Sequence, residues 1–285
     1  MRNNYVLRRL GRYSCIYLVV TCFALFAALP FYQMAVNAFK TDGDFNNTRE
    51  NNPFWFNEPA TTEHLEYLLE QTEYLTFIEN SLIIGVAVVL ITLILATPAA
   101  YSLARLLGRV GEPIGILIFM VYLIPPTLLF IPMSRVVSFM GLQNSKWALV
   151  AVYPSFTIPF CTWLLMGFMK SIPRDIEEQA MVDGYSRFGA MLRVVLPLSL
   201  PGLLTVVIFS FMLTLHEYIY ALAFTTTSSE KPISIGVTTE LIRGDVFFWQ
   251  SLMAAAIIVA LPVAIVYNLF LTRFVSGLTM GAVKG

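Results

Sequence analysis

Six long stretches of this chain contain no charged side chain. A helix that rises about 1.5 Å per residue needs about 20 residues to cross about 30 Å of hydrocarbon, and each stretch is long enough. Residues of the types AVILMFWYC make up 57% of the chain and charged residues only 13%, which is unlike an ordinary soluble domain. We therefore predict an all-α integral membrane protein with six transmembrane helices, within residues 13–39, 81–104, 113–134, 147–169, 194–216 and 246–272.

The distribution of basic residues predicts the orientation of these helices. The side with both termini and the loop at 170–197 carries twelve Lys and Arg residues, whereas the other side carries six. The positive-inside rule assigns the richer side to the cytoplasm. We therefore expect cytoplasmic segments at 1–12 and 273–285, a six-helix membrane domain at 13–272, and an outside segment at 40–79, where nine acidic residues gather.

The first stretch also has features of a secretory signal, because basic residues precede an apolar run. A signal core has about 7 to 15 apolar residues, and this stretch is longer. We expect an uncleaved first transmembrane helix.

Within the outside segment, residues 42–52 are rich in Asn and Asp and predict a loop. Thr62 is a typical capping residue, and Leu65, Leu68, Leu69 and Thr72 follow at helical spacing. An amphipathic surface helix is predicted at 62–70. The sequence leaves open whether it binds a partner or only covers the outer side of the helix bundle.

The cytoplasmic loop at 170–197 has the pattern of two short helices. Ser171 is suited to cap a first helix over about 172–182, with Pro173 in its first turn, and Gly184 suits the left-handed residue that ends it. Ser186 is suited to cap a second helix, which Pro197 and Pro201 would close. Its predicted apolar face consists of Phe188, Met191, Leu192 and Val195. We expect an elbow that lies along the membrane and projects its charged tip into the cytoplasm.

Few residues of the chain are candidates for catalysis or for binding a metal or a nucleotide. No lysine follows a glycine, so the chain lacks the Gly-x-x-x-x-Gly-Lys phosphate loop. Three cysteines in apolar stretches and two histidines predict neither a disulfide nor a metal site, and we expect no catalytic residue. Glu217 is the acidic candidate for a substrate path, although local structural hydrogen bonding is the favoured explanation. Weaker candidates for that path are His216, Tyr218, Asn80 and Ser81.

Five residues of the elbow match a known motif at the correct spacing: Glu178, Ala180, Gly184, Leu196 and Pro197. The match resembles the EAA loop of ABC importer permeases, with Gln179 and Val194 as mild departures. The segments 98–105, 217–222 and 277–285 are similar to maltose-type sugar permeases. His216 departs from these permeases, which often carry Asn at this position.

The resemblance implies a role for the elbow as a coupling helix that docks on an ATP-binding subunit through Glu177, Glu178, Gln179, Ala180, Asp183, Gly184, Leu196 and Pro197. It also implies that the tail residues Gly281, Val283, Lys284 and Gly285 reach the interface of two ATP-binding subunits. ATP and magnesium would be bound by those partners, and no cofactor by this chain.

The expected function is that of a permease subunit in a bacterial inner membrane importer for a disaccharide or oligosaccharide. The implied partners are a second homologous permease, two ATP-binding cassette subunits, an extracytoplasmic solute-binding protein and the lipid bilayer, without nucleic acid. Three alternatives stay open: an importer of this architecture for polyamine, phosphate or another solute, a secondary transporter, and a membrane scaffold.

Overall fold

The computed structural model describes the backbone of residues 2–47 and 49–282 and the side chains of residues 13–47 and 49–269. The described chain is mostly helical, as predicted. Its long helices are α1 (Arg2–Ala38), α4 (Tyr74–Tyr101), α5 (Gly111–Tyr122), α8 (Pro154–Ser171), α12 (Leu200–His216) and α15 (Trp249–Ala282). Shorter α-helices are α2 (Asp42–Asn46), α3 (Glu63–Glu70), α6 (Phe130–Phe139), α7 (Lys146–Val152), α9 (Arg174–Val182), α10 (Arg187–Ala190), α11 (Leu196–Leu198), α13 (Ile219–Phe224) and α14 (Ile233–Leu241).

Other helical turns join these elements. Two are π-helical, η1 (Ser102–Leu106) and η4 (Met191–Val195). Three are 3-10 turns, η2 (Gly108–Val110), η3 (Pro126–Leu129) and η5 (Ser228–Glu230).

Four helical segments are long and apolar enough to cross a membrane: Tyr13–Ala38, Tyr74–Leu106, Lys146–Ser171 and Trp249–Leu269. Two further candidates are bent pairs, Gly108–Tyr122 with Pro126–Phe139 at 80°, and Arg187–Leu198 with Leu200–His216 at 75°. The described chain thus has four candidate spans, or up to six if each bent pair is one span. The predicted count of six corresponds to the larger number.

The bends have local causes that the uncharged stretches did not reveal. Pro125 and Pro126 follow one another, and Pro125 has an extended ψ of 127°. The residue before a proline is disfavoured in the α conformation, so the helix ends there. By contrast, Pro98, Pro159 and Pro262 lie inside continuous helices.

Two local predictions are wrong. The segment 42–52 was predicted as loop, but it begins with α2, because the Thr41 hydroxyl accepts the Asp44 N–H at 3.1 Å. The last helix was predicted within residues 246–272, but α15 extends to Ala282, and a hairpin of β1 (Ile242–Arg243) and β2 (Val246–Phe247) occupies the start of that stretch. Glycine and aspartate between β-branched and aromatic residues favour such a turn, and Gly244 has a φ of +62°.

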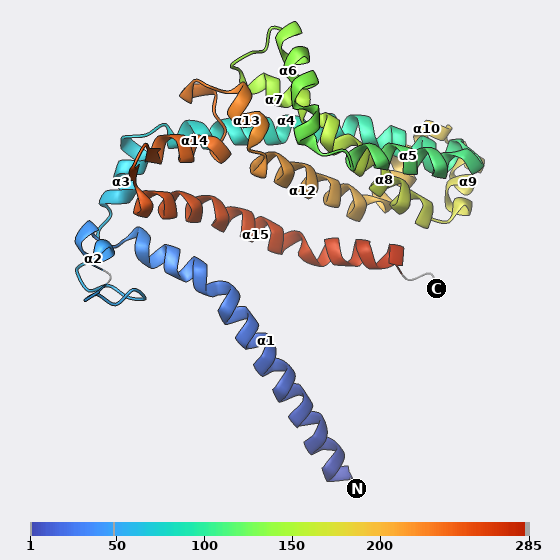
Figure 1. The fold of residues 1–285 in the computed structure, drawn as a ribbon. Helices are drawn as coiled ribbons and strands as arrows, with labels where there is room; N and C mark the ends of the chain where they lie inside the picture. Colours follow the sequence, from blue (N-terminus) through green and yellow to red (C-terminus); the bar gives the residue numbers. More distant parts are fainter. Residues whose placement is uncertain (1, 48, 283–285) are drawn as a thin grey trace. The chain divides into compact units, whose positions relative to one another are not determined.

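The chain forms two compact units. The first combines residues 1–72 with 241–261, and the second combines residues 73–240 with 262–285. In the second unit, α4 and α12 pack against α8 and against each other, and α5 packs against α8 (Figure 1). One apolar core of this unit includes Ile84, Leu149, Tyr153 and Tyr220, and another includes Ala100, Leu103, Cys161, Leu165, Met191 and Val195.

The first unit is held by polar contacts around α2 and α3. Lys40 and Asp44 form a buried ion pair, with 3.1 Å between Nζ and Oδ1. Near the chain's other end, Gln250 donates to Asp42 Oδ1 at 2.8 Å, and Ser251 donates to the His64 carbonyl at 3.2 Å. These bonds join the start of α15 to the segment 40–79.

The predicted surface helix exists as α3, but its cap differs from the prediction. The Thr62 hydroxyl makes no capping bond to the backbone and instead donates to Glu66 Oε1 at 2.6 Å. Leu68 is buried, Leu65 and Thr72 are half-buried, and Leu69 is exposed. The apolar face is therefore narrower than the predicted set.

Candidate functional site

The elbow, residues 170–197, begins where α8 ends at Ser171. The Ser171 hydroxyl donates to the Phe168 carbonyl at 2.7 Å and so does not cap α9, contrary to the prediction. Ile172 and Pro173 are extended, and α9 starts only at Arg174. The physical reason is again the proline, which keeps its preceding residue out of the helix.

The turn after α9 has the predicted glycine geometry. Gly184 has a φ of +92°, a conformation that side chains with a Cβ atom rarely adopt. Its N–H donates to the Met181 carbonyl at 3.1 Å, and the Tyr185 N–H donates to the Ala180 carbonyl at 3.1 Å. These bonds satisfy carbonyl groups at the end of α9.

The second helix of the elbow starts at its predicted cap, since the Ser186 hydroxyl accepts the Gly189 N–H at 3.1 Å. Only two of the four residues of its predicted apolar face are buried. Met191 and Val195 are buried, whereas Phe188 is 67% and Leu192 46% exposed. The π turn η4 widens the helix at this point, so side chains no longer share a face at the 3.6-residue spacing.

The two prolines predicted to close this helix lie on either side of its end. Pro197 lies inside α11 and does not end it, and Pro201 lies in the first turn of α12. The chain bends by 75° between Leu198 and Leu200. Leu196 is half-buried there and Pro197 is exposed.

The two neighbouring glutamates of the elbow have different surroundings. The Glu177 carboxylate is buried and receives a hydrogen bond from the Tyr101 hydroxyl. The Arg105 Nε atom lies 3.2 Å from Glu177 Oε2, with the two side chains 4% and 8% exposed. Glu178, in contrast, is exposed. Glu177 therefore attaches α9 to the end of α4, and Glu178 faces away from this contact.

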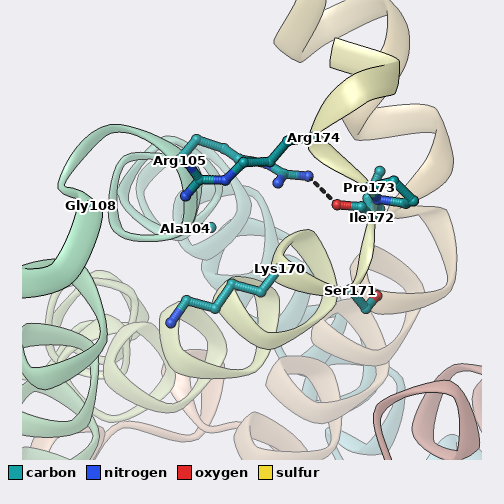
Figure 2. A pocket seen from close by; sticks show the side chains of 8 residues that line it. All are labelled: Ala104, Arg105, Gly108, Lys170, Ser171, Ile172, Pro173 and Arg174. Carbon is teal, nitrogen blue, oxygen red and sulfur yellow. Dashed lines mark hydrogen bonds between the residues drawn. The ribbon is translucent and has the colours of Figure 1, made fainter. Parts of the chain in front are cut away.

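The backbone geometry explains how Arg105 reaches the elbow. Arg105 belongs to the π turn η1, and its guanidinium also donates to the Ile172 carbonyl at 2.8 Å (Figure 2). The chain then turns back closely on itself, because a Cβ atom on Gly111 would lie 2.1 Å from the Leu103 carbonyl oxygen. Only a glycine permits this approach without a shift of the backbone.

The other motif residues of the elbow divide by burial. Ala180 is buried, at 6% exposure, on the side of α9 that packs against η4. Gln179, Asp183 and Gly184 are exposed. Val182 beside them is 87% exposed, so an apolar side chain is presented together with these polar groups.

A pocket of about 450 Å³ lies at the base of the elbow (Figure 2). Its basic lining residues are Arg105 from η1, Lys170 from the end of α8 and Arg174 from the start of α9. Lys170 is also paired with Glu112, with 2.9 Å between Nζ and Oε2. The sequence analysis did not predict this pocket.

Glu217, the acidic candidate for a substrate path, is engaged in internal hydrogen bonds. Its Oε1 accepts the Tyr220 N–H at 3.0 Å, and its Oε2 accepts the Ala221 N–H at 3.1 Å. The Tyr153 hydroxyl donates to the same Oε2 at 2.8 Å. These contacts cap the first turn of α13, which is the local hydrogen-bonding explanation of Glu217 that the sequence left open.

Asn80 and Ser81 are likewise used internally. Asn80 is 1% exposed and donates to the carbonyls of Ser229 and Lys231, and it accepts from Lys146 Nζ at 2.8 Å. The Ser81 hydroxyl accepts the Ile233 N–H at 2.7 Å. The two residues hold the segment before α14, whereas His216 and Tyr218 are exposed.

The predicted tail contacts lie mostly beyond the described part of the chain. The backbone of Gly281 is in α15. Val283, Lys284 and Gly285 lie outside the described residues.

Sequence reasoning missed the two partners of Glu177. Tyr101 and Arg105 were noted only as part of a segment similar to sugar permeases. A further signal was present, because Arg105 is the first charged residue after a long apolar stretch and its partner is an acid in the loop at 170–197. Pairing the two required knowledge of which spans are adjacent.

Comparisons with known proteins identify the family. A family model described as "Binding-protein-dependent transport system inner membrane component" matches residues 89–280, more than half of the chain. The diacetylchitobiose uptake system permease protein DasC of Streptomyces coelicolor is 34% identical over 93% of this chain and 96% of its own length. The trehalose/maltose transport system permease protein MalG of Thermococcus litoralis is 30% identical over 92% of this chain and 93% of its own length.

Solved structures agree with this fold. A chain of a bacterial ABC transporter involved in the import of the acidic polysaccharide alginate matches with a TM-score of 0.73 and 18% identity, over 94% of this chain and 97% of that one. The long apolar helices, the fold and the extent of these matches lead to one conclusion. This chain belongs to the family of binding-protein-dependent transport system inner membrane components.

Proposed function

We propose that this chain is one permease subunit of an ATP-driven importer that moves a disaccharide or oligosaccharide across the bacterial inner membrane. The relatives named for diacetylchitobiose, trehalose/maltose and maltodextrin support the carbohydrate substrate. The proposed assembly contains a second homologous permease, two ATP-binding subunits and an extracytoplasmic solute-binding protein. A solved relative of the same fold, in complex with a periplasmic protein that binds an alginate pentasaccharide, supports the last partner.

The observation that carries the proposal is the division of the elbow into a held side and a presented side. Glu177 is buried between Tyr101 and Arg105, so α9 is fixed to α4. Val182 and Phe188 are exposed by 87% and 67%, next to the exposed carboxylate of Glu178. Large apolar side chains at a surface are typical of a protein interface. An ATP-binding partner that docks on this side would move the elbow and α4 together.

In this mechanism the chain itself binds no nucleotide. ATP and magnesium stay on the partner subunits, and closure of those subunits pulls the elbow in a rigid-body movement. Glu178, Gln179, Asp183 and Gly184 form the docking side, while Ala180 and Leu196 support it from within. The proposal places the termini and the elbow in the cytoplasm and keeps six spans, with each bent pair as one span. The tail from Gly281 to Gly285 is proposed to contact the ATP-binding subunits.

The proposed substrate path rests on His216 and Tyr218, which are exposed at the end of α12. Glu217, Asn80 and Ser81 support this path indirectly, because their polar atoms form hydrogen bonds within the chain. Aromatic and polar side chains of this kind bind sugars through ring stacking and hydroxyl groups.

Reconstitution with the predicted partners tests the function. The four membrane and ATP-binding subunits are placed in proteoliposomes with the solute-binding protein and a labelled disaccharide. We expect uptake that requires both ATP and the solute-binding protein. Full-rate uptake without ATP would disprove the assignment as an ATP-driven importer. Uptake of a polyamine or phosphate, with no sugar bound by the solute-binding protein in an affinity screen, would sink the carbohydrate assignment alone.

A further inference from the structure

The pocket at the base of the elbow collects positive charge from three elements of the second unit. Arg105, Lys170 and Arg174 line it, from η1, α8 and α9. Figure 2 shows these three side chains around one opening, with the Ile172 carbonyl on its wall. The pocket has a volume of about 450 Å³, which is sufficient for a phosphate group and its glycerol substituents.

The charges of the pocket are only partly balanced. Arg105 is paired with the buried Glu177, and Lys170 with the exposed Glu112. Arg174 has neither a hydrogen bond nor an ion pair within the described part of the chain, and it lies close enough to Arg105 for the two charges to repel each other. An anion between these groups would relieve that repulsion, because opposite charges at close range stabilise each other.

The position of the pocket along the helices indicates the kind of anion. The candidate spans Tyr74–Leu106 and Lys146–Ser171 both end here, so the pocket lies at the depth of a lipid headgroup and not within the hydrocarbon. The inference rests on the proposed function in one respect, namely that this end of the spans is cytoplasmic. Anionic lipids in that leaflet attract basic residues beside transmembrane helices, and basic pockets between such helices bind phosphate headgroups.

We propose that Arg174 and Lys170, with Arg105 behind them, bind the phosphate group of an anionic phospholipid headgroup. Arg174 supplies the unbalanced charge, and Lys170 turns from the exposed Glu112 toward the phosphate. Arg105 stays on Glu177. The bound lipid would therefore sit directly against the contact that attaches the elbow to α4, and it would hold the base of the elbow at the membrane surface.

The test measures lipid binding on the transporter complex purified with its partners in a neutral detergent, without sugar or ATP. The probes are short-chain phosphatidylglycerol, short-chain phosphatidylcholine and inorganic phosphate. The variant carries Arg174→Gln and Lys170→Gln, and the control carries Arg193→Gln, an exposed arginine of the elbow that stacks on Tyr185 outside the pocket. Arg105 is left unchanged because it supports Glu177.

We expect phosphatidylglycerol to bind the unaltered complex and the control equally, and to bind the double variant about fivefold more weakly for each charge removed. Phosphatidylcholine should bind weakly to all three. Displacement of phosphatidylglycerol by millimolar inorganic phosphate from the unaltered complex would support a phosphate site at these residues. Binding of inorganic phosphate without binding of phosphatidylglycerol would identify free phosphate as the ligand and overturn the lipid assignment. Equal binding of phosphatidylglycerol by the variant and the control would overturn the proposal. Sugar uptake is measured separately, so a failure of the proposed transport function leaves this result readable.

Discussion

Each of the two compact units has a buried ion pair among its described residues, and the two pairs differ in what they connect. In the first unit, Lys40 and Asp44 lie four positions apart along the chain, and both side chains are 2% exposed or less. In the second unit, Arg105 pairs with Glu177, which also binds Tyr101 from 76 positions away. One pair is local and the other joins two distant helices.

The hydrogen-bond partners of the two ion pairs also differ, because they are local in the first unit and distant in sequence in the second. Asp44 accepts from the backbone N–H of Asn57 at 2.8 Å, and Lys40 donates to the Asn52 carbonyl at 2.8 Å. These contacts shape a short outside loop around one charge. The Arg105 and Glu177 pair instead bonds α4 to the elbow through side chains and the Ile172 carbonyl. The first pair therefore stabilises a local fold, and the second holds two elements together that are distant in the sequence.

The largest effect is expected from breaking the long-range pair. Glu177→Ala leaves Arg105 buried without a counter-charge, which costs about 3–5 kcal/mol. We expect sugar uptake by the reconstituted transporter to fall by at least about tenfold, since each 1.4 kcal/mol corresponds to about a factor of ten. Glu177→Gln should recover part of the activity because it keeps an acceptor for Tyr101. The measurement is uptake per assembled complex.

Glu178→Ala is the matched control for protein stability, since this neighbour is exposed. It should leave the thermal stability of the isolated chain in detergent unchanged, while Glu177→Ala lowers it. Equal stability of the two variants would remove the distinction between a held and a presented glutamate.

A smaller and more local effect is expected from Asp44→Ala. Lys40 would keep only the Asn52 carbonyl, and breaking the pair should cost about 3 kcal/mol. Limited proteolysis should then cut the segment 42–60 faster, with little change in elbow function. Glu50→Ala, in the same segment but exposed, serves as the control. Unchanged cleavage in the Asp44 variant would argue against a structural role for the local pair.

Gly184→Val should act on the turn and not on either pair. Its left-handed φ would strain a β-branched residue by about 1–3 kcal/mol, even though the space around the glycine is open. We expect ATP hydrolysis to continue with a reduced number of sugars moved per ATP. The same substitution at Gly167, a helical glycine of α8 with open space, is the control. A normal ratio of uptake to hydrolysis would contradict a coupling role for this turn.

The smallest effect under ordinary conditions is a pH dependence of the first unit. Burial raises the pKa of Asp44, but hydrogen bonds from Asn57, Lys40 and Glu58 lower it by more. The pKa is therefore about 2, below its ordinary value of 3.8. Because the pKa of Asp44 is lower in the folded than in the unfolded state, its ionised carboxylate stabilises the fold at pH values above about 4. This stabilisation is lost as the pH falls from about 4 to about 2. Trp55 fluorescence of the purified chain should report this loss. Asp44→Asn should remove that step, and an unchanged acid transition in the variant would disprove the assignment.

The sequence predicted the helical membrane class, the glycine turn at Gly184 and the Ser186 cap, because each depends on short-range chemistry. It did not predict that Ser171 fails to cap α9 or that Phe188 and Leu192 are exposed. In these places the backbone preference beside a proline or the entry of a π turn overrides the apolar pattern. Uncharged length alone predicts how much chain can cross a bilayer and not whether it stays straight.

The roles of the polar residues were harder to predict. Glu217, Asn80 and Ser81 were selected because polar groups near a membrane span are functional candidates, yet their atoms bond to Tyr153, Lys146 and the backbone before α14. Tyr101 and Arg105 were not selected, although they hold the elbow. Spacing along one helix gives no information about which distant helix lies opposite, and this is where the sequence argument stops.

The discontinuous first unit bears on the order in which the protein is made. Lys40 and Asp44 are able to pair soon after the first helix is synthesised, since loop closure over four residues is fast. The hydrogen bonds from Gln250 to Asp42 and from Ser251 to the His64 carbonyl form only after about 200 further residues have been added. The segment 40–79 therefore reaches its full set of bonds only in a chain whose last long helix has been synthesised, so a chain truncated before α15 would lack these bonds.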